Sequence, residues 1–265
     1  MTGSSRPRRP RLEIACFSAE SAIVAWKAGA DRVELCHDQE AGGTTPTLAS
    51  VDHVKKHVTI PVYMMIRPRG GNFVYSAHEF EQMRSDIDAF KPMVDGFVFG
   101  MLDSKGEVDV ERTSEMVRRA APLPCTFHRA FDKAKSLSRA LEDVVTSGVH
   151  AVLSSGGKEN AVAGSLVLQA LIVQARDRVQ ILPGGGVRAG NIERLQKTTG
   201  ADVFHSSGIP AGQLEIDADE VLHMRALLRR DDLYGQPEDD ESRSRHDSGQ
   251  EDGLSAERRT LVALS

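Results

Sequence analysis

Short apolar runs alternate with longer polar and amphipathic stretches along most of the chain. The starts of successive runs are 20 to 34 residues apart. This spacing leaves room for the crossover of a dozen or more residues that joins two parallel strands. The pattern therefore predicts eight strand–helix units. The predicted strands begin at Leu12, Arg32, Val62, Gly96, Cys125, His150, Val179 and Asp202.

Helix-capping residues mark the segments between these strands. Ser18 precedes a predicted helix over residues 21–27 as its N-cap. Ser76 and Glu79 have the spacing of a capping box, which predicts a helix to Phe90. Further helices are predicted over residues 136–146, 161–175 and 191–197, with a last one from Asp217 to about Arg229.

Glycines close several of these helices one or two residues before the next strand, as at Gly29, Gly148 and Gly200. A left-handed glycine there satisfies the last carbonyls of a helix. Eight such units in succession predict an α/β domain formed by a single (β/α)8 TIM barrel over residues 12–230. An open doubly wound sheet is the alternative, but such sheets more often have five or six strands.

Length and composition fit one domain of this kind. The chain has 265 residues, and a (β/α)8 barrel typically needs about 250. Apolar residues make up 40% and charged residues 27%, which excludes a collagen, a coiled coil or a wholly disordered chain. No stretch of about 18 apolar residues is present, so we expect no membrane partner. Three cysteines without a secretory signal indicate a reducing, cytoplasmic compartment.

Charge gathers at the two ends of a chain whose net charge is −5. Residues 1–11 carry four arginines and are predicted to form a flexible basic arm, with a nuclear-import or polyanion-binding patch as the alternative. Residues 231–265 are rich in acidic side chains and are predicted to form a disordered tail. The body between them is near neutral, which argues against a nucleic-acid partner.

Candidate acid–base residues follow from the alternation of side chains along the strands. A TIM barrel builds its active site at the carboxyl ends of its strands. Because the helix-facing side of each strand is apolar, the alternation predicts that Glu13, Glu34, Cys36, Arg67 and His128 point into the barrel. We expect Glu13, Glu34 and His128 to be catalytic. Ion pairs of the two glutamates with Arg32, Arg67 or Arg129, and a structural role for His128, are the alternatives.

An anion site is predicted beside these residues. The loop of Gly184, Gly185 and Gly186 and the serines Ser206 and Ser207 follow the seventh and eighth strands, where barrels of this type bind phosphate through backbone N–H groups. Arg67 and Arg129 can pair with the same anion. The alternatives are that the glycines only permit tight turns and that the arginines form surface ion pairs.

Several of these motifs occur together in one known family. The segment Leu12 to Cys36, GGTTP from Gly42, IRPRGG from Ile66, TFHRAFD from Thr126 and the serines after the eighth strand resemble the copper homeostasis protein CutC family. The resemblance implies a cytosolic (β/α)8 barrel, a homo-oligomer, and Cu(I) binding by cysteines of the first two strands. The second-strand cysteine corresponds to Cys36. The first-strand position is Ala15 here, and the neighbouring Cys16 falls on the opposite face by parity.

Two functions are therefore predicted. The first is a CutC-like role in copper homeostasis, with Cu(I) bound by Cys36 and Cys16. The alternative is a metal-independent barrel enzyme that uses acid–base chemistry on a small metabolite bearing phosphate or carboxylate. The fold is compatible with both, so the side chains of the site have to decide.

Overall fold

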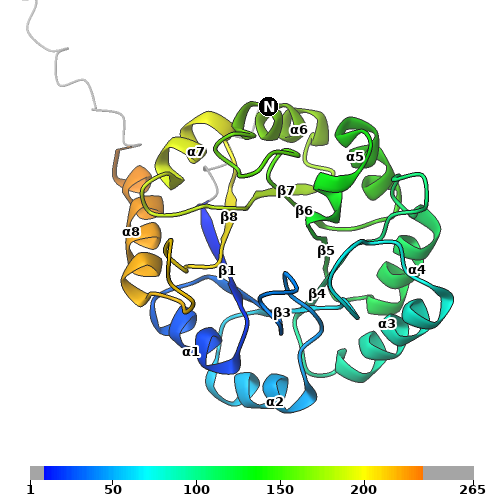
Figure 1. The fold of residues 1–265 in the computed structure, drawn as a ribbon. Coiled ribbons are helices and arrows are strands. Elements are labelled where there is room, and N and C mark those ends of the chain that lie inside the picture. The colour runs from blue at the N-terminus through cyan, green and yellow to red at the C-terminus, as the bar shows by residue number, and fades with distance from the viewer. Residues whose placement is uncertain (1–8, 235–265) are drawn as a thin grey trace, which may run out of the picture. The chain divides into compact units, whose positions relative to one another are not determined.

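The computed structural model describes residues 9–234, and the side chains of residues 230–234 are outside that description. Figure 1 looks down the axis of a ring of eight parallel strands surrounded by eight helices. The strands are β1 Arg11–Cys16, β2 Arg32–Leu35, β3 Val62–Met65, β4 Gly96–Phe99, β5 Cys125–Phe127, β6 Ala151–Ser154, β7 Gln180–Pro183 and β8 Val203–Ser206. The predicted TIM barrel is confirmed.

The helices alternate with the strands as the sequence predicts. They are α1 Ala19–Lys27, α2 Leu48–His57, α3 Ala77–Phe90, α4 Val110–Ala120, α5 Leu137–Thr146, α6 Ser165–Ala175, α7 Ile192–Thr199 and α8 Ala218–Tyr234, with a short 3-10 helix η1 Arg129–Lys133 after β5. Capping fixes several starts: Ser18 caps α1, Ser76 and Glu79 form the capping box of α3, and Ser136 caps α5.

Two predicted domain boundaries differ from the structure. Arg11 is already the first residue of β1, where its N–H donates to the carbonyl of Asp202. Helix α8 continues to Tyr234, past the predicted start of the tail at residue 231, because no glycine or proline interrupts the sequence before Gly235. The rest of the predicted arm and tail, residues 1–8 and 235–265, lies outside the described residues.

Strand pairing runs in the order β7-β6-β5-β4-β3-β2-β1-β8. The seam between β7 and β8 is filled by Leu182 and Val203, which pack with Ala151 and Leu153 inside the barrel. The larger apolar core lies between the strands and the helices and includes Cys16 and Cys125. Cys36 instead packs on Met65 and Val98 in a separate inner cluster. The predicted alternation of inward and outward side chains is thereby observed.

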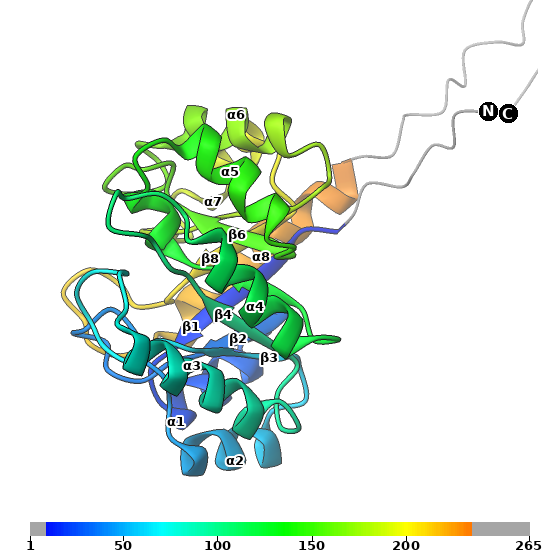
Figure 2. The same cartoon turned by 90° about the vertical axis from the view of Figure 1, so that its right-hand side faces the viewer.

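The carboxyl ends of the strands and their loops gather at one end of the barrel. Figure 2 shows the loops after β2, β3 and β8 projecting on the side opposite the start of β1 and the end of α8. Within the described residues, no helix is long and apolar enough to cross a membrane.

Gly164 lies in close contact with the backbone of Ser155 in the loop after β6. We therefore expect that one added methyl group at this position destabilises the protein. A Cβ built on Gly164 would lie 1.9 Å from the carbonyl oxygen of Ser155. We expect Gly164→Ala to lower the free energy of unfolding by about 3 kcal/mol, since neither backbone can yield freely. Gly190→Ala, where a Cβ meets nothing within 4 Å, is the control. Urea denaturation of both variants measures the difference, and equal stabilities would contradict the prediction.

Candidate functional site

A chain of charged side chains crosses the barrel interior. Glu13 on β1 accepts hydrogen bonds from Arg32 on β2 and, through Oε1, from Nδ1 of His205 on β8 at 2.7 Å. Nε2 of His205 lies 3.6 Å from Oε2 of Glu34 on β2. Glu13 and Glu34 are at most 3% exposed and His205 is 8% exposed. Because unpaired buried charges are expensive, the four residues stabilise one another as a unit.

Glu13 is the ionised member of this chain. Burial by itself raises the pKa of Glu13, but the Arg32 guanidinium and the hydrogen bond from His205 lower it to about 2. Arg32 also stacks on the ring of Tyr63, with 4.1 Å between its Cζ and the ring centroid. Of the alternatives for Glu13, the ion pair with Arg32 is the one observed.

The pKa of Glu34 is shifted in the opposite direction to that of Glu13. Burial raises the pKa of Glu34 to about 7, with a further rise from the Glu13 charge and an opposing effect from His205. Burial lowers the pKa of His205, but the two carboxylates outweigh it and the pKa is raised above 6.5. Oε1 of Glu34 has no hydrogen-bond partner in the described part of the chain. Glu34 therefore titrates near neutral pH, with the imidazole of His205 3.6 Å away.

His128, at the end of β5, lies apart from this chain. Its Nδ1 accepts from the N–H of Ala130, and its ring packs 5.0 Å from that of Phe73. Burial and the nearby Arg67 charge lower the pKa of His128 to about 3. The neutral ring then carries its proton on Nε2, which is buried without a partner among the described residues. His128 can donate a hydrogen bond at neutral pH but is a poor proton acceptor.

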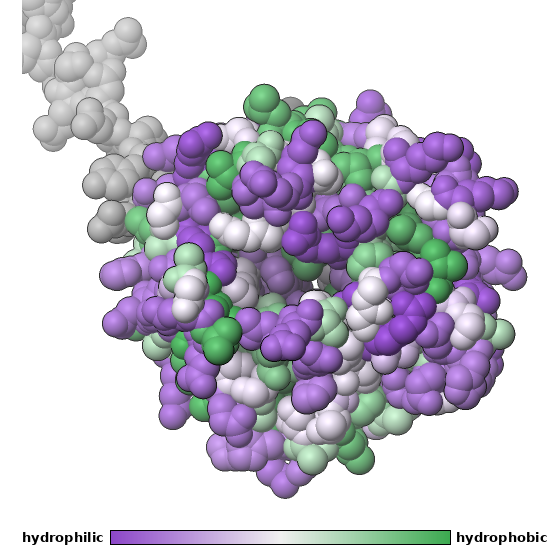
Figure 3. All heavy atoms as spheres, viewed as in Figure 1, coloured by the Kyte–Doolittle hydropathy of each residue, from purple (hydrophilic) through white to green (hydrophobic). Residues whose placement is uncertain are grey.

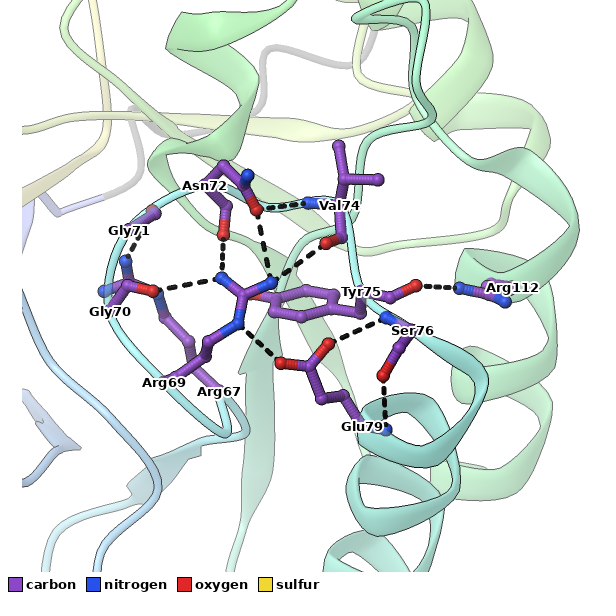
Figure 4. A network of polar contacts seen from close by, with 10 residues as sticks. All are labelled: Arg67, Arg69, Gly70, Gly71, Asn72, Val74, Tyr75, Ser76, Glu79 and Arg112. Atoms are coloured by element: carbon purple, nitrogen blue, oxygen red, sulfur yellow. Dashed lines mark hydrogen bonds and ion pairs between the residues drawn. The ribbon is translucent and has the colours of Figure 1, made fainter.

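Arg67 and Arg69 hold loops at the mouth of the barrel. Arg67 is buried and donates from Nη1 to the carbonyls of Ala41, Gly42 and Gly43 and from Nη2 to that of Gly71. Figure 4 shows Arg69 bound to Glu79 and to carbonyls of its own loop. The Nη groups of Arg67 are thus occupied by backbone oxygens, and we do not retain Arg67 as an anion clamp.

Arg129 lies beside the predicted glycine loop. It donates from Nε to Asp132 and from Nη2 to Ser155, at 2.8 Å each. A Cβ built on Gly185 would come within 3.1 Å of Nη1 of Arg129, so only glycine lets the loop approach this closely. Nη1 makes no hydrogen bond within residues 9–234. Asp132 is held by further donors, among them the N–H groups of Ser155 and Gly157.

The other predicted anion-binding residues have mixed environments. Gly184 packs tightly against Leu153 and His205, because a Cβ built there would lie 2.3 Å from the first and 3.3 Å from the second. Gly186 lies beside Asn160. The hydroxyls of Ser206 and Ser207 both accept from Arg188, at 3.0 and 3.1 Å, and are used to hold the loop after β8. Free donors at this corner therefore come from Arg129 and the glycine backbone.

The three cysteines do not form a common metal site. The Cys16 thiol faces the helices and donates to the carbonyl of Ile14, while Cys36 faces the interior. Burial and the neighbouring Glu34 raise the pKa of the Cys36 thiol well above 9.0. Within residues 9–234, no three His, Cys, Asp or Glu side chains are grouped so that they could hold a metal ion. Cys16 is thus not a partner of Cys36, for the reason of strand parity.

Sequence reasoning placed Glu13 and Glu34 in the interior but missed His205 and Arg188 as functional residues. Alternation on the eighth strand could have found His205, because it shares the inward face with Ser207. No sequence pattern indicated the role of Arg188, since its contacts depend on how the loops after β7 and β8 fold.

The buried chain predicts a pH dependence of stability. The pKa of Glu34 is raised from 4.5 to about 7, so its stabilising contribution is complete below pH 4.5 and is lost as the pH rises through 7. We expect the free energy of unfolding to fall between pH 4.5 and 7 in the wild type and to fall less in Glu34→Gln. Glu142→Gln, on the outside of the barrel, is the control. Equal slopes in urea denaturation across this range would contradict the assignment.

Comparison with known proteins shows several close relatives. A CutC family protein from Xylella fastidiosa is 45% identical over 197 residues, which cover 74% of each chain. The human copper homeostasis protein cutC homolog is 44% identical over 197 residues, 74% of this chain and 72% of its own. A crystal structure of CutC from Streptococcus agalactiae superposes with a TM-score of 0.71 at 31% identity and covers 75% of this chain and 98% of that one.

A more distant likeness concerns the fold alone. Phosphoribosyl anthranilate isomerase from Thermotoga maritima has a TM-score of 0.54 at 15% identity, with 83% of this chain and 99% of that one covered. The family profile that matches this sequence is that of the CutC family, over residues 11–210. The motifs, the barrel and these relatives agree, and the chain belongs to the CutC family.

Proposed function

We propose that this CutC family member binds a small anionic metabolite at the mouth of its barrel and exchanges a proton with it through Glu34 and His205. The observation that carries the proposal is the buried chain Arg32–Glu13–His205–Glu34. A carboxyl group whose pKa is raised to about 7 beside an imidazole is suited to giving and taking protons at neutral pH.

Each member of the chain has a distinct role. Arg32 keeps Glu13 ionised, and Glu13 accepts a hydrogen bond from the Nδ1–H group of His205. This contact orients the ring so that Nε2 faces Glu34. A proton can then pass between Glu34, Nε2 of His205 and an atom of the ligand. Glu34 and His205 are the proposed acid–base pair, Glu13 is a positioning residue, and His128 is a hydrogen-bond donor.

The anionic end of the metabolite is assigned to the corner formed by Arg129 and the glycine loop. Nη1 of Arg129 lies next to Gly185, and Gly184 next to His205. An anion held by Nη1 and the N–H groups of Gly185 and Gly186 would therefore be anchored within reach of the acid–base pair.

Phosphate binding tests this assignment. We expect phosphate to shift the amide resonances of Gly185 and Gly186, and Arg129→Gln to weaken binding by about 1.5–3 kcal/mol, the range for a hydrogen bond to a charged group. Arg139→Gln, a surface arginine paired with Glu107, is the control and should bind as the wild type does. Unchanged affinity in Arg129→Gln, or phosphate shifts elsewhere only, would refute the anion site.

Cu(I) binding is a second candidate function, favoured by one observation. Cys36 packs against Met65 inside the barrel, which brings together a thiol and a thioether. These soft sulfur ligands are the kind that Cu(I) prefers. We propose Cys36 as the main ligand, without Cys16. Copper ion and anionic metabolite thus remain the proposed partners, and a cytosolic homo-oligomer stays a prediction from the family.

Anaerobic competition against a Cu(I)-specific chelator measures the contribution of Cys36. Cys36→Ser should weaken Cu(I) binding at least tenfold, because the thiol is the strongest donor of the pair. Cys125→Ser, a buried thiol that faces the helices, is the matched control and should leave binding unchanged. If Cys36→Ser binds Cu(I) as tightly as the wild type, this candidate function fails.

A further inference from the structure

A cavity of about 420 Å³ opens at the mouth of the barrel among the loops that follow β1, β2 and β8. We call it the corner cavity. Its inner wall includes Ala15 and Ser207. Ala15 is the register partner of Glu34, and Ser207 directly follows β8, two residues beyond His205. The corner cavity therefore leads from the surface toward the acid–base pair, and its volume is that of a small-molecule site.

The larger part of the surface that lines the corner cavity is apolar. Phe17, Val24, Ile209, Leu214 and Ile216 line it. Leu214, one of these side chains, is 83% exposed. Figure 3 shows this end of the molecule, with hydrophobic residues gathered next to the loop after β8 beside a hollow centre. An organic group in the cavity would remove these side chains from water.

Three carboxylates and one imidazole line the corner cavity. They belong to Glu20, Asp38, Glu215 and His37, and no lysine or arginine lines the cavity among the described residues. One oxygen of Asp38 accepts from the N–H of Ala41, in the loop that Arg67 pins in place. The Asp38 carboxylate is thus held in place by its own loop. An apolar hollow rimmed by carboxylates complements a ligand that is both apolar and positively charged.

We propose that the corner cavity binds an apolar group bearing an amine, and that the metabolite handled by Glu34 and His205 carries such a group. This inference rests on the proposed function. Together with the anion corner at Arg129, it assigns the metabolite to zwitterions in which an apolar segment joins an amine to a phosphate or carboxylate. Oε1 of Glu34 is buried without a partner among the described residues, and Ala15, the register partner of Glu34, lines the corner cavity.

Three probes of similar shape test the charge preference in the full-length protein: phenethylamine, 2-phenylethanol and 3-phenylpropionate. In NMR titrations we expect phenethylamine to shift Phe17, Ser207 and Ile209 and the ring of His205. The alcohol should bind at least threefold more weakly, and the carboxylate more weakly still. If the carboxylate binds as tightly as the amine, or if none of the probes shifts these residues, the inference is overturned.

Substitutions of exposed residues test the carboxylates and the apolar wall of the corner cavity separately. Asp38→Asn with Glu215→Gln should reduce the preference for amine over alcohol to less than twofold, and Glu142→Gln should leave it unchanged. Leu214→Ala should weaken all three probes alike. A preference that survives the double substitution contradicts the charge assignment. Amine binding that leaves His205 unmoved contradicts the link to the acid–base pair.

A parallel titration with phosphate distinguishes failure of this inference from failure of the proposed function. Loss of phosphate binding with intact amine binding would refute the anion corner alone. Phosphate binding at Gly185 without amine binding would refute the corner cavity alone.

Discussion

The interior of the barrel depends on the pairing of the buried Glu13 carboxylate with positively charged and hydrogen-bonding partners. A carboxylate that is 1% exposed cannot stay ionised without partners, and Arg32 and His205 supply them from the two neighbouring strands. The strand register makes this possible, because Glu13 is the register partner of both Arg32 and His205. With Glu13 ionised and His205 oriented, Glu34 is left as the group that titrates near neutral pH.

Above this charged layer, the mouth is built from small side chains and pinned loops. Ala15 and Ser207 are small residues that line the corner cavity, where larger side chains would fill it. Gly100 is required by the close approach of His128, whose Nδ1 would lie 2.5 Å from an added Cβ. Arg67 and Arg188 each tie neighbouring βα-loops together through backbone carbonyls. The hollow is therefore preformed, which lowers the entropic cost of binding a ligand there.

The chain belongs to a family named for copper homeostasis, but most side chains of this interior are not the ligands that copper prefers. The side chains at the centre of the barrel are carboxylates, an imidazole and guanidinium groups, which suit proton transfer to an organic ligand. Among residues 9–234, the sulfur groups that pack together in this interior are those of Cys36 and Met65. Glu34 lies beside Cys36 and raises the pKa of its thiol. A metal bound there and a proton moved through Glu34 would therefore influence each other.

Local sequence determined the elements, and tertiary structure decided the partnerships. Apolar periodicity and capping residues such as Ser18 and Ser76 predicted the strands and helices because these signals depend on neighbours in the chain. Strand alternation likewise placed Glu13, Glu34 and Cys36 inside and Cys16 outside. Sequence could not show that His205, 192 residues away, donates a hydrogen bond to Glu13, or that the Nη atoms of Arg67 are occupied by loop carbonyls. Those contacts depend on barrel closure and loop conformation, which bring together residues that lie far apart in the sequence. Their spacing along the chain therefore does not predict the contact.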